Sequence, residues 1–529
     1  MTKYLVFIFA IFCLGNEIIS AQNFQWLKSL GGNDVDVTRG VCIDNSGNIY
    51  ITGTFQSTTV INGITYNSNG ATDIFIVKMN AAGNYLWIRT FGSSSFDYVF
   101  DIDNDINGNI AITGAFRNTM VLPGGLSITS AASADEFTAK LDTNGNCIWA
   151  KTGSGATFDM GNEINITPQG NILTIGNTEG NITFDGNTLT HIDNTDVFFA
   201  KYNPSGIFQT AKLFGGIGTA QGRAISSDEN ENILIAGVFT GQMTIGTNTL
   251  NSSNTNDEDC FVAKLDPNGN AIWVKQYGSS IGSDYARGID ADAQGNIYVS
   301  GVFSGTVNFD GNVLTANGTS DIFLLKYNSV GNIIWIKQIG GNFSDEGCEI
   351  EVKDNGDVFA TGQYSQTIVL NGNNFNALGA RDVFISKMNS DGDFIWNKTL
   401  GGPQDDVNYA IGLNRINEEL VTVGTYSSSF TDGLTTINSN GNVDSYISKI
   451  SAPELSIPSF DDNNKLIVYP NPSNQILNVN CNNGFHIYSK LGQLIEKSLV
   501  STKIIDISKF AKGVYILKSE NKTSIFIKN

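Results

Sequence analysis

The chain has 529 residues, of which 41% are hydrophobic and only 16% charged, and it contains 57 glycines. This composition excludes an intrinsically disordered chain and favours a β protein rich in turns. The formal charge of −20 is concentrated in residues 22–464, which hold 21 basic and 47 acidic groups, so nucleic acid and anionic lipid are disfavoured as partners.

Residues 1–21 are predicted to be a secretory signal peptide. Lys3 precedes an apolar run from Tyr4 to Leu14, and the small residue Ala21 suits the position before cleavage. The run is too short to cross a bilayer, and no other segment approaches the ~20 apolar residues that a spanning helix needs. We therefore expect an exported protein without a transmembrane segment.

Residues 22–451 contain seven copies of one unit. The glycine that ends the second apolar run of each copy recurs at intervals of 61 to 64 residues, as Gly53, Gly114, Gly176, Gly237, Gly301, Gly362 and Gly424. An Asp-x-Phe/Tyr-x-x-Lys segment and a Trp-x-Lys/Arg segment recur with the same period as this glycine. All six tryptophans occupy this one repeat position, which makes chance a poor explanation. A period of this size is typical of a propeller or solenoid.

Each unit is expected to fold into four antiparallel strands. In the first unit a Gly-Asn turn at Asn45–Asn48 precedes an alternating strand at Ile49–Phe55, and a second hairpin joins residues 73–79 to 86–91. Such turns need residues that tolerate positive φ. Sheets of this kind bury both faces only when they stack against neighbouring sheets.

The last unit ends at Ser451 without a tryptophan strand, and the segment Phe24–Leu30 carries one before the first unit. An N-terminal strand that completes the last sheet would remove an exposed edge. We therefore predict an all-β fold, a seven-bladed β-propeller over residues 22–451 that is closed by an N-terminal outer strand and is monomeric.

This order of motifs resembles the SBBP family of β-propeller repeats over residues 24–451. The chain departs from the pattern at Thr210, Glu231 and Glu418, which weakens local turns but leaves seven units. The resemblance implies a propeller fold and little about chemistry.

Residues 452–464 contain two prolines and are predicted to be a linker, after which residues 465–529 break the repeat. Short strands separated by polar turns predict a small β-sandwich. The motif order resembles the type A C-terminal sorting domain of the type IX secretion system, through Tyr469, Pro470, Asn471, Pro472, Gly492, Gly513 and Tyr515. That resemblance implies passage through the periplasm, the type IX machinery as partner, and release or attachment at the outer cell surface. An ordinary accessory β-sandwich is the alternative.

Candidate catalytic and metal-binding residues are few. The only histidines are His191 and His486, which nearly excludes histidine triads and multi-histidine zinc sites. Five cysteines remain after processing without a shared spacing, so we expect buried thiols and no disulfide framework. The segment Asp103–Gly108 matches half of a calcium loop but lacks the glutamate at the twelfth position, so a turn is favoured over a calcium site. No cofactor is expected, and calcium stays open.

One set of carboxylates recurs with the repeat and forms the candidate binding site: Asp36, Asp97, Asp159, Asp284, Asp345 and Asp406. In a ring these side chains are expected to circle one mouth of the channel, on the face that carries the long connections. The favoured interpretation is that each accepts backbone N–H groups and fixes a loop between blades. A cation or polar-ligand site is the alternative, because clustered carboxylates repel one another.

Two functions compete. The first is a noncatalytic secreted or surface protein that binds a glycan, protein or matrix component on the loop face of the propeller. The second is a carbohydrate-active enzyme that hydrolyses glycosides through two loop carboxylates. An enzyme is expected to break the repeat near its site, yet the widest connection, between Phe239 and Asp259, exceeds the others by only about two residues. The uniform units therefore favour binding, and no enzyme activity is expected.

Overall fold

The computed structural model describes residues 24–451 and, in the C-terminal part, residues 466, 468–479, 484–489, 493–498, 504–519 and 522–528. The two parts are separate compact units. All regular elements of the described residues are β-strands, which confirms the all-β prediction. No helix among them is long and apolar enough to cross a membrane. The predicted signal peptide and linker lie outside the described residues.

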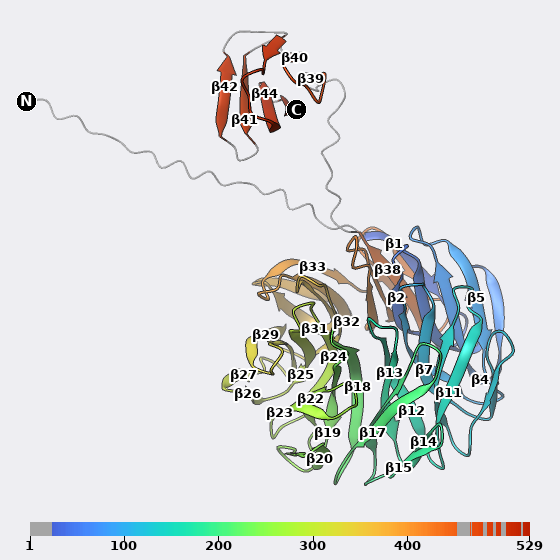
Figure 1. The fold of residues 1–529 in the computed structure, drawn as a ribbon. Coiled ribbons are helices and arrows are strands. Elements are labelled where there is room, and N and C mark those ends of the chain that lie inside the picture. Colours follow the sequence, from blue (N-terminus) through green and yellow to red (C-terminus); the bar gives the residue numbers. More distant parts are fainter. Residues whose placement is uncertain are drawn as a thin grey trace, which may run out of the picture. The chain divides into compact units, whose positions relative to one another are not determined.

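The strands of residues 24–451 pair antiparallel in repeating groups of four, which we call units (Figure 1). Short additional pairings extend the group of unit 2 and join those of units 5 and 6. In unit 1, β2 (Asp36–Ile43), β3 (Ile49–Ile61), β4 (Ile64–Met79) and β5 (Tyr85–Phe91) pair in chain order. Units 2 to 4 are β6 (Tyr98–Asn104), β7 (Ile110–Phe116), β10 (Asp135–Leu141) and β11 (Cys147–Gly155); β12 (Asp159–Ile166), β13 (Ile172–Thr178), β16 (Asp196–Tyr202) and β17 (Phe208–Phe214); and β18 (Ala220–Ser227), β19 (Ile233–Phe239), β22 (Asp259–Leu265) and β23 (Ala271–Tyr277).

Units 5 and 6 are β24 (Tyr285–Ala291), β25 (Ile297–Phe303), β28 (Asp321–Tyr327) and β29 (Ile333–Gly341); and β30 (Asp345–Val352), β31 (Val358–Leu370), β32 (Asn373–Met388) and β33 (Phe394–Leu400). In units 2, 3, 4, 5 and 7, the long connection holds a small hairpin: β8 (Thr119–Val121) with β9 (Ser127–Thr129), β14 (Ile182–Phe184) with β15 (Asn187–Leu189), β20 (Gln242–Ile245) with β21 (Asn248–Asn251), β26 (Thr306–Phe309) with β27 (Asn312–Thr315), and β36 (Ser429–Thr431) with β37 (Thr436–Asn438).

Unit 7 combines both ends of this part of the chain. It contains β34 (Val407–Leu413), β35 (Leu420–Tyr426) and β38 (Asp444–Ile450), and its fourth strand is β1 (Phe24–Leu30). Strand β1 pairs antiparallel with β38, with Leu30 opposite Ser445. The N-terminal strand therefore occupies the edge of the last unit, as the sequence predicts.

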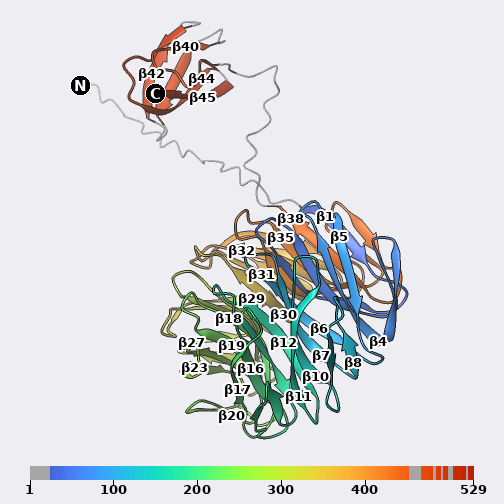
Figure 2. The same ribbon diagram turned by 45° about the vertical axis from the view of Figure 1, so that its right-hand side comes forward.

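The first strands of the units, β2, β6, β12, β18, β24, β30 and β34, are the inner strands. Each contacts the inner strand of the next unit, and β34 contacts β2. Figure 2 shows β6, β12, β18 and β30 among these strands. The second and third strands are buried along their whole length in most units, as in β7 and β10, because a neighbouring unit covers each face of the sheet. Together these features describe a propeller-like arrangement of sheets.

The repeated lysine and tryptophan join neighbouring units. Lys326 Nζ and Trp335 Nε1 of unit 5 both donate to the carbonyl oxygen of Ser390 in unit 6, each at 3.0 Å. The repeated lysine also forms an ion pair with a carboxylate of its own unit. In unit 4, the buried Lys264 Nζ lies 2.8 Å from Asp228 Oδ2. Two of the predicted buried thiols, Cys42 and Cys260, are buried and form no disulfide.

The C-terminal unit contains two antiparallel sheets. One consists of β39 (Val468–Tyr469), β40 (Ile476–Val479) and β43 (Ile504–Asp506), and the other of β42 (Leu494–Ser498), β41 (Phe485–Ser489), β44 (Gly513–Ser519) and β45 (Lys522–Lys528). Both sheets contribute to one apolar cluster, which includes Leu477, Ile487, Ile505, Leu517 and Phe526. Hence the described strands of this unit share a single core.

Candidate functional site

The six predicted aspartates lie at or just before the start of an inner strand, and each is at most 2% exposed. Five of them accept a backbone N–H from four or five residues earlier in the chain. Asp36 Oδ2 accepts from Gly32 at 2.6 Å, and Asp345 and Asp406 repeat this contact. Asp159 accepts the hydroxyl of Thr178 instead. Their carboxylates therefore fix the connections between units, which is the favoured interpretation of the sequence.

Most of these aspartates face a second buried aspartate from the third strand of the preceding unit. Burial raises the pKa of Asp406 to about 8, and the Asp382 carboxylate adds to this rise. Burial likewise raises the pKa of Asp345 to about 7 and that of Asp36 to about 6. Among the described residues, no group of three or more His, Cys, Asp or Glu side chains is placed to hold a metal ion. Calcium binding at these aspartates stays a prediction.

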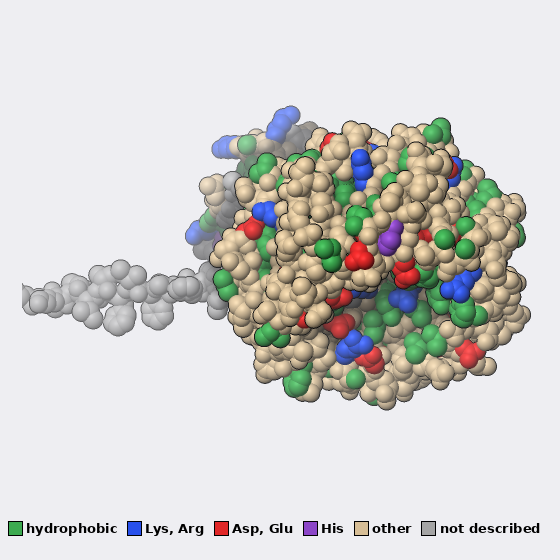
Figure 3. Space-filling model, turned by 90° about the horizontal axis from the view of Figure 1, so that it is seen from below, with side chains coloured by type: hydrophobic (Ala, Val, Ile, Leu, Met, Phe, Trp, Pro, Cys, Tyr) green, Lys and Arg blue, Asp and Glu red, His purple; other side chains and the backbone are tan. Residues whose placement is uncertain are grey.

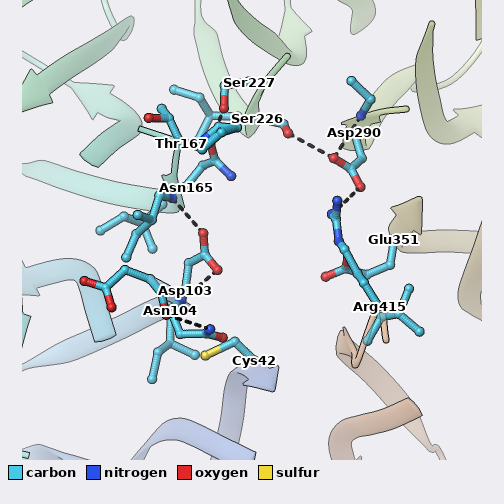
Figure 4. Close-up of a pocket in the computed structure, with 18 of the residues that line it drawn as sticks. Cys42, Asp103, Asn104, Asn165, Thr167, Ser226, Ser227, Asp290, Glu351 and Arg415 are labelled. Carbon is cyan, nitrogen blue, oxygen red and sulfur yellow. Dashed lines mark hydrogen bonds and ion pairs between the residues drawn. The ribbon is translucent and has the colours of Figure 1, made fainter. Parts of the chain in front are cut away.

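A cavity of about 720 Å³ lies at the other ends of the inner strands, where these strands finish. None of the six aspartates lines it. In units 1 to 6, the residues six positions after the repeated aspartate position, which is Ala220 in unit 4, surround it in Figure 4: Cys42, Asp103, Asn165, Ser226, Asp290 and Glu351. Two positions earlier stand Asp101, Glu163 and Glu349, which also line the cavity. Residues two apart on a strand share one face, so both rows point the same way.

Backbone contacts hold the cavity carboxylates in place. Asp101 Oδ2 accepts the N–H of Ile164 at 3.0 Å, and Asp103 Oδ2 accepts that of Ile166 at 2.6 Å, both from the next inner strand. Asp290 Oδ2 accepts the N–H of Val352 at 2.8 Å in the same manner. These acids bridge adjacent units. The second oxygens of Asp103 and Asp290 are also engaged, because Asp103 Oδ1 accepts the N–H of Asn104 and Asp290 Oδ1 accepts the N–H of Ala291 and the hydroxyl of Ser226.

Burial in the cavity favours the protonated form of several of its carboxyl groups. Burial raises the pKa of Asp103 to about 6 and the pKa values of Glu349 and Glu351 to about 8. Arg415, from the turn after β34, opposes this rise in Glu351. Its Nη2 lies 3.1 Å from Asp290 Oδ2 and 3.3 Å from Glu351 Oε2. Among the described residues, Arg415 and Lys140 thus line the cavity together with eleven Asp and Glu residues, which favours a ligand that is cationic or rich in hydrogen-bond donors.

Other residues that the sequence singled out are not brought together. In the half calcium loop, Asp103 and Asp105 both line the cavity, and Asp105 also starts a turn and pairs with Lys140 at 3.0 Å. His191 Nδ1 lies 2.8 Å from Asp196 Oδ2, away from the cavity. On the face shown in Figure 3, acidic, basic and hydrophobic side chains all border a hollow.

The predicted sorting residues have distinct places in the C-terminal unit. Tyr469 ends β39, and Pro470 and Pro472 follow in the adjoining turn. Asn471 ties this turn to β45, since its Nδ2 donates to the Ile525 carbonyl at 2.9 Å and its Oδ1 accepts the N–H of Ile527 at 2.8 Å. In β44, which starts at Gly513, the buried Tyr515 donates its hydroxyl to the Ala511 carbonyl at 2.8 Å. Gly492 lies outside the described residues.

Comparison with known families supports both resemblances. Residues 467–529 match the family described as "Secretion system C-terminal sorting domain". This match indicates export to the cell surface or secretion. Residues 272–302, which include β24 and most of β23 and β25, match the family described as "Beta-propeller repeat".

Curated relatives are distant and much longer. The chain is 26% identical over 424 residues to "Uncharacterized WD repeat-containing protein L264" of Acanthamoeba polyphaga mimivirus, covering 65% of this chain and 30% of that protein. It is 28% identical over 164 residues to "Regulatory protein FlaEY" of Caulobacter vibrioides, covering 30% and 17%. The chain thus spans less than a third of either relative.

Two solved structures resemble the chain at low similarity. Quinohemoprotein alcohol dehydrogenase from Comamonas testosteroni aligns with a TM-score of 0.37 and 9% identity, over 82% of this chain and 77% of that chain. A chain of the mitotic checkpoint complex aligns with a TM-score of 0.41 and 8% identity, over 84% and 98%.

Proposed function

We propose that this chain is an exported, noncatalytic binding protein. It consists of a closed seven-bladed propeller, which binds a glycan, protein or matrix component, and a C-terminal β-sandwich that directs export by the type IX system. The sorting-domain match supports the route of export.

The contact between units 7 and 1 supports closure of the ring with seven blades. In unit 1, Lys78 Nζ and Trp87 Nε1 both donate to the Thr143 carbonyl of unit 2. Lys449 of unit 7 makes the equivalent bond to the Ala81 carbonyl of unit 1 at 2.7 Å. The last junction thus repeats the lysine bond of the junction between units 1 and 2, which supports a closed ring of seven units.

The acidic cavity is the observation that carries the binding function. Its volume of about 720 Å³ lies within the range of ligand sites, ~300–1,000 Å³. Its carboxylates are preorganised by backbone bonds, so binding does not require them to reorder. Carboxylate oxygens accept hydrogen bonds from sugar hydroxyls and pair with amines. This site therefore suits a hydroxyl-rich glycan or a basic group of a protein or matrix component.

A glycoside-hydrolase-like activity is the second candidate. Glu349 and Glu351, with pKa values of about 8, would be protonated at neutral pH, whereas Asp103, with a pKa of about 6, would be ionised. Carboxyl groups with separated pKa values are what acid and base catalysis of glycoside cleavage needs. The contacts of these groups with backbone and Arg415 favour the structural and binding role.

The test is a screen of the full chain on an array of glycans and matrix components, with and without calcium, followed by calorimetry on the hits. We expect the double variant Glu163→Gln/Glu349→Gln to lose at least tenfold in affinity, because both side chains face the ligand. Glu179→Gln, an exposed carboxylate away from the cavity, is the matched control and should bind normally. Unchanged affinity in the double variant would refute binding at this cavity, and release of reducing ends from a bound glycan would establish the enzyme instead.

A further inference from the structure

Every junction between two units contains the same backbone hydrogen bond. At the junction of units 6 and 7, the N–H of Asp406 donates to the carbonyl oxygen of Arg381 at 3.1 Å, and Arg381 directly precedes Asp382 of β32. The residues that donate in the same way at the other junctions are Asp36, Asp97, Asp159, Ala220, Asp284 and Asp345. Each bond brings the donating residue close to an aspartate in the third strand of the preceding unit: Asp382 here, and elsewhere Asp444, Asp73, Asp135, Asp196, Asp259 and Asp321.

Six of these junctions bring two buried aspartates together, each at most 2% exposed. Burial raises the pKa of the aspartate at the repeated position in all six, and the charge of the third-strand aspartate raises it further. At the junction of units 6 and 7, Oδ1 of Asp382 and Oδ1 of Asp406 are both buried without a hydrogen-bond partner. One proton placed between the two carboxyls satisfies both oxygens and removes one of the two buried charges.

Other charged groups around these pairs add to the repulsion. Besides the partner aspartate, the groups whose charge raises the pKa of these aspartates include Asp34, Glu136, Glu179 and Asp405. Arg381, beside the junction of units 6 and 7, is itself paired with Asp405, with 2.6 Å between Nε and Oδ1. Two ionised carboxylates therefore repel each other at such a junction, and a retained proton replaces this repulsion by a hydrogen bond.

The junction between units 3 and 4 replaces one member of the pair. Unit 4 has the buried Ala220 at the repeated aspartate position, whereas unit 3 keeps the fully buried Asp196. His191, the one histidine of residues 24–451, places its Nδ1 2.8 Å from Asp196 Oδ2. The nearby Asp193 contacts Asp196 through its backbone N–H, and its own carboxylate accepts the N–H of Gly218. The junction that lacks the second carboxyl thus has a histidine, a residue that can carry a proton, which indicates that each third-strand aspartate needs a proton donor.

We propose that a shared proton joins the two aspartates at six junctions between units, and that His191 supplies the proton to Asp196 at the seventh. The proton lies between one oxygen of each carboxyl, so that a pair carries one negative charge instead of two. The units therefore hold together by protons that alkaline solution removes. This device belongs to the junctions and not to the cavity, and it goes beyond the binding function proposed above.

The raised pKa values set the pH range of the device. They are about 6 for Asp36 and Asp284, about 7 for Asp345, and about 8 for Asp159 and Asp406, against an ordinary value of 3.8. Because the folded state holds these protons more tightly than the unfolded state, their contribution to stability is fully present below pH 3.8. It is lost as the pH rises through about 6 to about 8.

The test transplants an aspartate pair to the junction between units 3 and 4. Calorimetry gives the melting temperature of the full chain at pH 6 and pH 9 for His191→Ala, alone and combined with Ala220→Asp or Ala220→Asn. His191→Ala should melt below the wild type at pH 6, because Asp196 loses its donor. Adding Ala220→Asp should recover most of this loss at pH 6, and at pH 9 it should lower the melting temperature further, because both carboxyls are then ionised. Ala220→Asn is the matched control and should recover the loss at both pH values, since an amide N–H donates at either.

A recovery by Ala220→Asp that is as large at pH 9 as at pH 6 would overturn the proposal, because no proton would then be needed. Unchanged melting of His191→Ala, or no recovery in either double variant, would overturn it as well. The native pair of Asp321 and Asp345 gives a second measurement should these variants fail to fold. In a titration of the folded chain from pH 5 to pH 9, Asp345→Asn should release about one proton fewer than the wild type, and the exposed Asp391→Asn should match the wild type. Equal proton release by Asp345→Asn and the wild type would contradict the shared proton.

Discussion

The dependence of the free energy of unfolding on pH tests whether Asp406 has a structural role or binds a ligand. Asp406 is fully buried, and its Oδ2 accepts the N–H of Gly402 at 2.6 Å. Neither its Oδ1 nor the Oδ1 of the neighbouring Asp382 has a hydrogen-bond partner. Burial, aided by Asp382, raises the pKa of Asp406 from 3.8 to about 8.

The raised pKa means that the folded state holds this proton more tightly than the unfolded state. Its contribution to stability is therefore fully present below pH 3.8 and is lost as the pH rises through about 8. At ~1.4 kcal/mol per pH unit, the loss between pH 5 and pH 8 has an upper bound of ~4 kcal/mol, which coupling to Asp382 reduces.

We expect Asp406→Asn to remove this slope. The amide oxygen can still accept from Gly402, and the amide N–H groups can donate to the unpaired oxygen of Asp382. The variant should thus match the wild type at pH 5 and exceed its free energy of unfolding at pH 8. Asp406→Ala should instead lose ~1–3 kcal/mol at pH 5, because it leaves the Gly402 N–H unpaired.

Urea unfolding at pH 5, 6, 7 and 8, followed by tryptophan fluorescence, measures these differences, with Asp391→Asn as an exposed control. An Asn variant with the same pH slope as the wild type would refute the buried, protonated carboxyl. A saturable calcium-dependent rise in melting temperature that Asp284→Ala abolishes would show that these aspartates hold a cation, contrary to our expectation.

Three further changes test the rest of the fold. Deletion of residues 24–30 should expose an unpaired edge and cause aggregation or a large fall in melting temperature; unchanged melting and monomeric elution on gel filtration would refute the closure. Removal of residues 469–529 should leave the folded propeller in the periplasm of a type IX-competent host, and its normal appearance in the medium, detected by immunoblot, would contradict the sorting role. Lys264→Ala should cost ~3–5 kcal/mol in urea unfolding, because it leaves Asp228 charged and buried, whereas Lys151→Ala on the surface should cost under ~1 kcal/mol; equal costs would refute the buried pair.

The repeat was predictable from the sequence because similar contacts recur at the junctions between units. In units 1, 4 and 5 the repeated lysine and tryptophan both donate to one carbonyl of the next unit. In units 3 and 6 the lysine instead pairs with a glutamate of the next unit, Glu231 or Glu418. Unit 7 lacks a tryptophan strand and the N-terminal segment carries an extra one, so the sequence predicted that the two pair. Strand β1 pairs with β38. Turn boundaries and strand number follow from the same periodicity. The β-bulges in the inner strands could not be predicted, because no residue type marks them.

The acidic cavity escaped sequence reasoning for a physical reason. Comparing the units selects residues that all of them share, and a shared residue is one that every junction requires, such as the buried aspartates that Asp36 and Asp345 exemplify. A ligand at the centre of a ring meets each unit from a different side, so its contacts need different residues in each unit. The residues that line the cavity at one repeat position fit this expectation, because they differ from unit to unit: Cys42, Asp103, Asn165, Ser226, Asp290 and Glu351. In a propeller, residues that repeat on the inner strand therefore indicate architecture, and the position at which the units differ is where a binding site should be sought.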